Sequence, residues 1–229
     1  MNWAPPVLAP WRLARGLRRH PSAILLAVQL LGILSYPLME NTGAGRALFG
    51  AMSIAVLSLV LWVVNRATAR WVAWLLAVPS VLLSLLANFA GLPALTPFAH
   101  ALESILYFYA VAGLIRYMLG DLRVSTDELV AAATTFTLLA WAFAYAYSAC
   151  QAWVPGSFSE VTVPPQPRTW MELLFLSYST LSGVGLSDIV PLAPAARALT
   201  MLAMFAGVMY IAIVVSRLIA LTVIRQQQH

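Results

Sequence analysis

The sequence predicts an all-α membrane protein. Of the 229 residues, 62% are hydrophobic and only 9% are charged, whereas soluble domains carry about 25% charged residues. Six apolar runs are each close in length to the ~20 residues that a helix needs to cross the hydrocarbon core. These runs span residues 21–39, 44–64, 71–92, 98–119, 129–153 and 195–223. The alternating segments typical of membrane β-barrels do not occur, so we expect a helical bundle in a lipid bilayer.

Arginine supplies every basic residue, and its distribution predicts the orientation of the chain. Cytoplasmic loops carry an excess of arginine and lysine. A basic arm at 1–20 holds four arginines, and further ones follow every second apolar run: Arg12, Arg15, Arg18, Arg19, Arg66, Arg70, Arg116, Arg123, Arg217 and Arg225. The opposite loops hold only Arg46, Arg168 and Arg197. We therefore expect a multi-pass protein of the cell inner (plasma) membrane with both termini in the cytoplasm. The basic arm is an uncleaved orientation anchor in this interpretation, and no nucleic-acid partner is predicted.

A polar stretch at 120–128 divides the chain into two modules. The first, 21–120, consists of four plain helices. Its fourth run holds Glu103 near one end and Arg116 near the other, and we expect Arg116 to extend to the interface. Voltage sensing needs several basic residues within such a run, so this module is a scaffold without an arginine ladder. Asn88, His100 and Glu103 are polar residues at membrane depth; we expect mutual hydrogen bonds or headgroup contacts, with a ligand-binding pocket as the alternative.

The second module, 121–229, is predicted to contain helix, loop, short helix, loop and helix. Alanine and aromatic residues fill the run 129–153, which suits tight packing between subunits. The loop 159–168 holds three prolines and cannot be helical. Thr169 and Glu172 have the spacing of a capping box, which predicts a short helix from there to about Leu181. The lone Cys150 excludes an internal disulfide and any cysteine-based metal cluster.

The stretch 177–191 reads S-Y-S-T-L-S-G-V-G-L-S-D-I-V-P and lies between two long apolar runs. It resembles the pore of the tetrameric potassium-channel family, whose pattern is T-L-T-T-V-G-Y-G-D-I-x-P, and in particular the bacterial six-transmembrane, one-pore-loop channels. Aligned without gaps, the matching residues are Thr180, Leu181, Val184, Gly185, Asp188, Ile189 and Pro191. The resemblance implies a re-entrant pore loop. One loop cannot encircle an axis, so it also implies a homotetramer.

By this resemblance, permeant ions would bind the backbone of Gly183, Val184, Gly185 and Leu186, supported by Ser182, Ser187 and Asp188. Three residues depart from the pattern. Gly183 removes a threonine hydroxyl, Leu186 replaces the tyrosine, and Ser187 replaces the outer glycine. If that last position needs a positive φ, Ser187 costs about 1–2 kcal/mol. A looser outer filter is therefore expected. The tetrapeptide V-G-L-S also resembles pore loops of Trk/Ktr/HKT-type potassium transporters.

The last run resembles the inner helix of the same bacterial channels, in which P-L-A-R-S-L and Y-L-A-V-L-I-A-R-L are typical; here the segments 194–199 and 210–219 correspond. Gly207 lies near the midpoint, where it is either a hinge or a packing contact. With Gly207, residues on one helical face would line the gate and cavity: Val208, Ile211, Val215 and Ile219. The resemblance covers about residues 127–222.

Together these features predict a homotetrameric cation channel that conducts K⁺ with reduced selectivity, or also Na⁺, and is not voltage-gated in the standard way. The alternative is a non-conducting or regulatory subunit with the pore fold and a lost filter. No organic cofactor and no enzymatic activity are predicted, because His20, His100 and His229 are poorly placed to pair with Ser182 or Ser187.

Overall fold

The computed structural model describes residues 21–39, 56, 58, 59, 70–120, 126–160, 166–217, 219, 220 and 223. The basic arm at 1–20, nearly all of the predicted run 44–64, and residues 121–125 of the predicted linker lie outside the described residues. Within the described part, three helices are long and apolar enough to cross a membrane: Pro93–Gly120, Leu129–Trp153 and Pro194–Val215. Two shorter apolar helices span Ser22–Tyr36 and Trp71–Ala87. The all-α prediction is confirmed.

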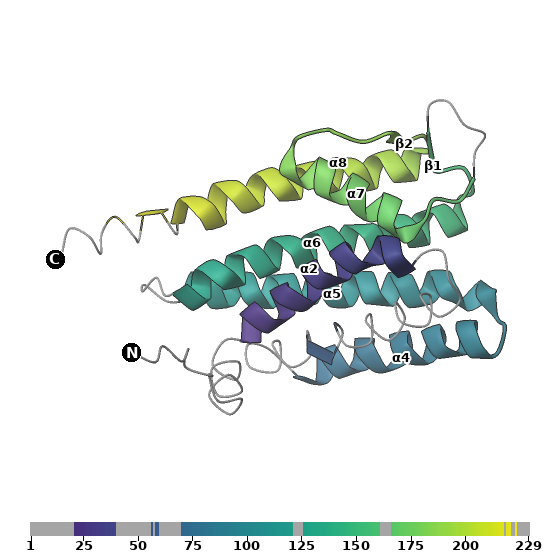
Figure 1. Cartoon of the computed structure of the whole chain (residues 1–229), viewed down its shortest axis with the longest axis horizontal. Coiled ribbons are helices and arrows are strands. Elements are labelled where there is room, and N and C mark those ends of the chain that lie inside the picture. Colours follow the sequence, from purple (N-terminus) through teal and green to yellow (C-terminus); the bar gives the residue numbers. More distant parts are fainter. Residues whose placement is uncertain are drawn as a thin grey trace, which may run out of the picture.

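The described elements follow the predicted runs closely. They are α2 (Pro21–Met39), α4 (Arg70–Phe89), a short 3₁₀ turn η1 (Pro93–Leu95), α5 (Thr96–Gly120), α6 (Thr126–Trp153), β1 (Phe158–Glu160), α7 (Trp170–Ser182), β2 (Ile189–Pro191), α8 (Pro194–Tyr210) and the π-helical turn η2 (Ile211–Val215). Figure 1 shows the long helices running side by side, with α7 and both strands at one end of the bundle.

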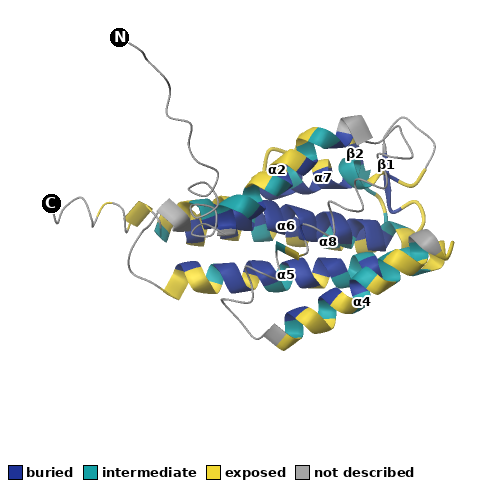
Figure 2. Ribbon diagram, turned by 60° about the horizontal axis from the view of Figure 1, so that its bottom comes forward, coloured by how far each residue is buried: buried dark blue, intermediate teal, exposed yellow. Residues whose placement is uncertain are grey.

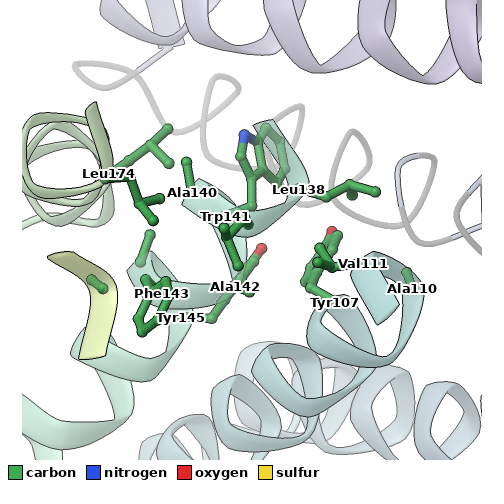
Figure 3. Close-up of a cluster of buried hydrophobic side chains, with 14 of the residues drawn as sticks. Tyr107, Ala110, Val111, Leu138, Ala140, Trp141, Ala142, Phe143, Tyr145 and Leu174 are labelled. Atoms are coloured by element: carbon green, nitrogen blue, oxygen red, sulfur yellow. The ribbon is translucent and has the colours of Figure 1, made fainter. Parts of the chain in front are cut away.

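Helix α6 forms the centre of the bundle and packs against α2, α5, α7 and α8. In the most apolar stretch of α6, 72% is buried inside the protein, against 28% in that of α8. Figure 2 shows α6 largely in the dark blue of buried residues. Figure 3 shows Trp141, Phe143 and Tyr145 of α6 packed with residues of α5 and α7. These aromatic side chains were expected to pack between subunits. That expectation is wrong, because neighbouring helices of the same chain bury them.

Helix α8 presents one buried and one exposed apolar face. The buried residues recur at intervals of three or four: Ala196, Thr200, Ala203, Gly207 and Tyr210, continued by Val214 of η2. This spacing places them on one stripe of a helix, which faces α6 and α7. Large apolar side chains on the other faces are exposed, among them Met201, Leu202, Phe205 and Val208. The single chain therefore leaves most of α8 available for lipid or for another subunit.

The two strands form an antiparallel ribbon that the sequence did not predict. Phe158 pairs with Pro191 and Glu160 with Ile189, so β1 occupies the beginning of the expected loop 159–168. The N–H of Leu192 also donates to the carbonyl oxygen of Ser157 at 2.8 Å. The ribbon ties the segment that follows α6 to the segment that precedes α8.

Candidate functional site

The predicted capping box is confirmed at the start of α7. The N–H of Glu172 donates to Thr169 Oγ1 at 3.3 Å, and the N–H of Thr169 donates to Glu172 Oε2 at 2.5 Å. Next to this cap, Gln151 of α6 holds both backbone groups of Arg168: its Oε1 accepts from the N–H at 2.9 Å, and its Nε2 donates to the carbonyl oxygen at 2.8 Å. Glu172 therefore works as a helix cap, and the start of α7 is fixed to the end of α6.

Helix α7 is too short to cross a membrane. Its 13 residues extend about 20 Å at 1.5 Å per residue, while a hydrocarbon core is about 30 Å thick. The chain enters α7 beside β1 and returns to β2, which pairs with β1. Figure 1 shows this return along the top of the bundle. We call residues 183–188, between α7 and β2, the return segment. It contains the predicted filter residues.

Two glycines shape the return segment. Gly183 ends α7 in the left-handed conformation, with φ 72° and ψ 10°, and its N–H donates to Thr180 O at 3.3 Å. Gly185 has a φ of 71°, and its N–H donates to Ser179 O at 3.2 Å. Only glycine adopts this conformation at low cost. Gly183 therefore serves as the C-cap of α7, whereas the comparison with the channel pattern indicated only that a threonine hydroxyl is missing at this position.

The strain predicted at Ser187 does not occur. Among the described residues a positive φ is found only at glycines, so Ser187 takes a conformation that suits a residue with a side chain. Its Oγ accepts from the N–H of Ile189 at 3.1 Å and lies 3.2 Å from the carbonyl oxygen of the same residue, to which it donates. The earlier expectation assumed a left-handed outer position, whereas here the bend is completed at Gly185. Ser187 stabilises the outer end of the return segment.

The rest of the predicted filter is exposed in the single chain. The side chains of Val184 and Leu186 are 70% and 68% exposed, and Ser182 and Asp188 are exposed as well. Ser182 Oγ donates to Ser179 O at 3.3 Å, within the last turn of α7. The structure therefore brings the predicted residues together on one continuous segment with a free surface.

The predicted gate and cavity residues divide into two groups. Val208, Ile211, Val215 and Ile219 are all exposed. Gly207 instead is buried against α7: a Cβ built there would lie 2.0 Å from Leu181 O and 2.7 Å from Leu181 Cα. Of the two alternatives for this glycine, the structure provides the packing contact. Only a residue without a side chain allows α8 to approach the end of α7 so closely.

The π-helical turn that follows was not predicted from the sequence. At Ile211–Val215 the helix widens for one turn, a feature that often occurs at functional sites. Polar contacts on either side fix this turn to the remaining helices. The hydroxyl of Tyr210 donates to Ala132 O of α6 at 2.5 Å, and Arg217 Nη1 donates to Leu119 O of α5 at 2.5 Å.

Two of the predicted polar residues of the first module, His100 and Glu103, find partners within the protein. Ser84 Oγ of α4 donates to Glu103 Oε1 at 3.3 Å, and His100 Nδ1 lies 2.9 Å from Ser148 Oγ of α6. The expectation was mutual hydrogen bonds among Asn88, His100 and Glu103 or contacts with headgroups. His100 and Glu103 instead have serine partners on neighbouring helices, and the side chain of Asn88 lies outside the described residues. His100 and Ser148 also line a cavity of about 420 Å³ beside the ribbon. Within the described residues, no group of three acidic, histidine or cysteine side chains could hold a metal ion.

A comparison with protein-family models identifies the chain. The model described as "Ion channel" matches residues 104–223, more than half of the 229 residues. The chain belongs to this ion channel family. The match begins within α5 and includes α6, the ribbon, α7, the return segment and α8. No curated protein and no solved structure matches the chain. The channel is a membrane protein, and the short helix α7 and the return segment lie within the part that the family model covers.

Proposed function

We propose that this channel is a homotetrameric cation channel whose ion pathway is lined by the return segment. The observation that carries the proposal is the course of the chain at α7. Helix α7, which is too short to cross a membrane, ends at two glycines in the left-handed conformation, and an exposed, non-helical segment follows it. In a membrane such backbone is tolerated only where protein or a water-filled path surrounds it. One such segment per chain is supplied fourfold by a cyclic tetramer.

Within that assembly the backbone carbonyls of residues 183–186 would replace the hydration shell of the ion. Potassium is the proposed ion, with reduced discrimination against sodium. Two residues support the reduced selectivity: Gly183 offers no hydroxyl oxygen, and Leu186 has no polar group with which to anchor the segment to its surroundings. The C-terminus of α7, with the negative end of its dipole, would point toward the ion.

The same proposal includes six membrane crossings, cytoplasmic termini and a location in the inner (plasma) membrane. It also includes gating that is not voltage-dependent in the standard way. Arg116 is exposed near one end of α5 and Glu103 is buried near the other. The residues between them, 104–115, are uncharged, so no ladder of charges is present in α5 to move through the field.

The rival proposal is a non-conducting subunit that keeps the pore fold. The exposure of Leu186 and Val184 favours it, because apolar side chains on both sides of Gly185 could close an axis against water. Recording of the purified protein in planar bilayers separates the two proposals. Single-channel openings with a reversal potential between the potassium and sodium equilibrium values support conduction. Silence of a verified tetramer under all tested voltages supports the rival.

A matched pair of variants tests whether the return segment carries the current. Gly185→Ala places a side chain at a φ of 71°, and Gly91→Ala does the same at a φ of 66° in the turn before η1; neither meets an atom within 4 Å. Each costs about 1–2 kcal/mol of backbone strain. We expect the first variant to lose conduction about tenfold or more, as that strain shifts the carbonyls, and the second to conduct like the wild type. Equal effects of both variants would contradict a special role of the return segment.

A further inference from the structure

Glu103 is a buried acid that the ion pathway does not use. Its side chain is 5% exposed. The Ser84 hydroxyl on α4 donates to its Oε1 at 3.3 Å, and the Tyr145 hydroxyl on α6 is hydrogen-bonded to the same carboxyl group. Within the part of the chain that the structure describes, no basic side chain forms an ion pair with Glu103. Ionisable residues inside a membrane are costly and are usually functional.

The cavity reaches α5 one helical turn before this carboxyl group. His100 lies one helical turn before Glu103 on α5 and lines the cavity together with Ser148, Gln151 and Phe158. The ring of His100 lies 5.4 Å from the ring of Tyr145. Tyr145 therefore contacts the accessible histidine with its ring and the buried acid with its hydroxyl group. A neutral imidazole accepts a proton at one ring nitrogen and releases one from the other, which suits His100 to relay a proton inward.

The same tyrosine contacts the beginning of α7. Its ring lies 5.6 Å from that of Trp170, the first residue of α7, and Trp170 packs edge-on against Trp141 at 4.9 Å. Figure 3 shows Tyr145 and Trp141 within this cluster. A change in the hydrogen bonding of Tyr145 would thus act directly on the helix that carries the return segment.

The titratable neighbours of Glu103 are few. On α5 itself they are His100 and Tyr107, and Tyr107 stacks on Tyr145 with centroids 5.5 Å apart. From α6 only Tyr145 faces the carboxyl group, and α4 contributes Ser84, which does not titrate. The charged pair of Arg168 and Glu172 lies at the start of α7, with nitrogen and oxygen 3.7 Å apart. The local charge is therefore set mainly by Glu103.

We propose that Glu103 is a proton-binding site, loaded from the cavity through His100, and that its occupancy changes conduction through the contact between Tyr145 and Trp170. The link to conduction rests on the function and orientation proposed above. A proton would pass from water in the cavity to a ring nitrogen of His100 and on to the Glu103 carboxylate, and no other bond would change. The protonated carboxyl group becomes a donor, so the Tyr145 hydroxyl can change from donor to acceptor in its hydrogen bond with Glu103.

Infrared difference spectroscopy of the protein in lipid vesicles tests the site without requiring conduction. Acidification of the external side from about pH 9 to 5, a range in which buried carboxylic acids titrate, should produce the C=O stretch of a protonated carboxylic acid. Glu103→Gln should remove that band. Ser84→Ala and Tyr145→Phe keep the acid and remove one hydroxyl each, so they should shift the band even if Glu103→Gln does not fold. If no protonated band responds to Ser84→Ala, Tyr145→Phe or Glu103→Gln, the site is overturned.

Conduction of the same preparations tests the second half of the proposal. Wild-type currents should change severalfold with external pH, and Tyr145→Phe, which retains the ring, should reduce that dependence while the band still titrates. Undiminished pH dependence in Glu103→Gln would overturn the proposal. If the protein conducts at no pH but the band still titrates, the proton site stands and its link to conduction is overturned. The failure would then lie in the proposed channel function.

Discussion

Replacement of Gly207 by alanine tests the closest helix contact in the structure. The added Cβ would lie 2.0 Å from Leu181 O and 2.6 Å from Leu181 C, where real contacts are at least 3.0 Å. Both are backbone atoms that cannot rotate away, so α8 and α7 must separate by about 1 Å at this point. Overpacking of this kind destabilises the folded state by about 1–3 kcal/mol, and the higher helix propensity of alanine stabilises it by about 1 kcal/mol. Since the clash is with backbone, we expect a net loss of about 2 kcal/mol.

Thermal unfolding of the protein in nanodiscs measures this loss. A change of about 2 kcal/mol corresponds to roughly 4–8 °C in Tm for a chain of this size. Gly120→Ala is the matched control, because Gly120 is also a helical glycine yet meets no atom within 4 Å, and the Tm of this variant should not fall. Leu181 lies two residues before Gly183, so Gly207→Ala should also reduce conduction. A Tm equal to that of the wild type, with unchanged currents, would refute the role assigned to this contact.

Two further predictions concern the return segment and the first module. Ser187→Ala removes the hydrogen bonds to Ile189, worth about 0.5–1.5 kcal/mol, and should lower selectivity for potassium in reversal-potential measurements. Ser187→Gly should not raise that selectivity, because there is no backbone strain to relieve. A raised selectivity in Ser187→Gly would show that the backbone at this position is strained. Opening should depend weakly on voltage, with an effective gating charge below about 2–3 per tetramer, where true sensors carry about 3–4 per subunit; a steeper dependence in single-channel records would identify α5 as a sensor.

The helices and the start of α7 were predictable because their signals are local. Apolar runs of about 20 residues gave the described spans to within a few residues, and the capping box needs only the spacing of Thr169 and Glu172. The family resemblance rested on residues 177–191 and the inner helix, and the matched family model covers both.

The features that were missed depend on contacts between distant parts of the chain. The strands are three residues each, and their pairing joins Phe158 to Pro191, which no local pattern indicates. The aromatic residues of α6 were predicted to pack between subunits, because composition does not show whether the same chain or another subunit covers them. Ser187 was judged by an alignment that required a left-handed outer position, and the structure places that conformation at Gly183 and Gly185 instead.

A high-resolution map of the reconstituted protein in potassium tests the central proposal most directly. We predict a fourfold-symmetric assembly with the return segments around its axis, and ion density at fewer than the usual number of sites, centred on the carbonyls of Val184 and Gly185. Replacement of potassium by sodium should leave that density in place, since selectivity is expected to be weak. A monomer or dimer, or a tetramer in which the return segment lies away from the axis, would contradict the proposed ion pathway.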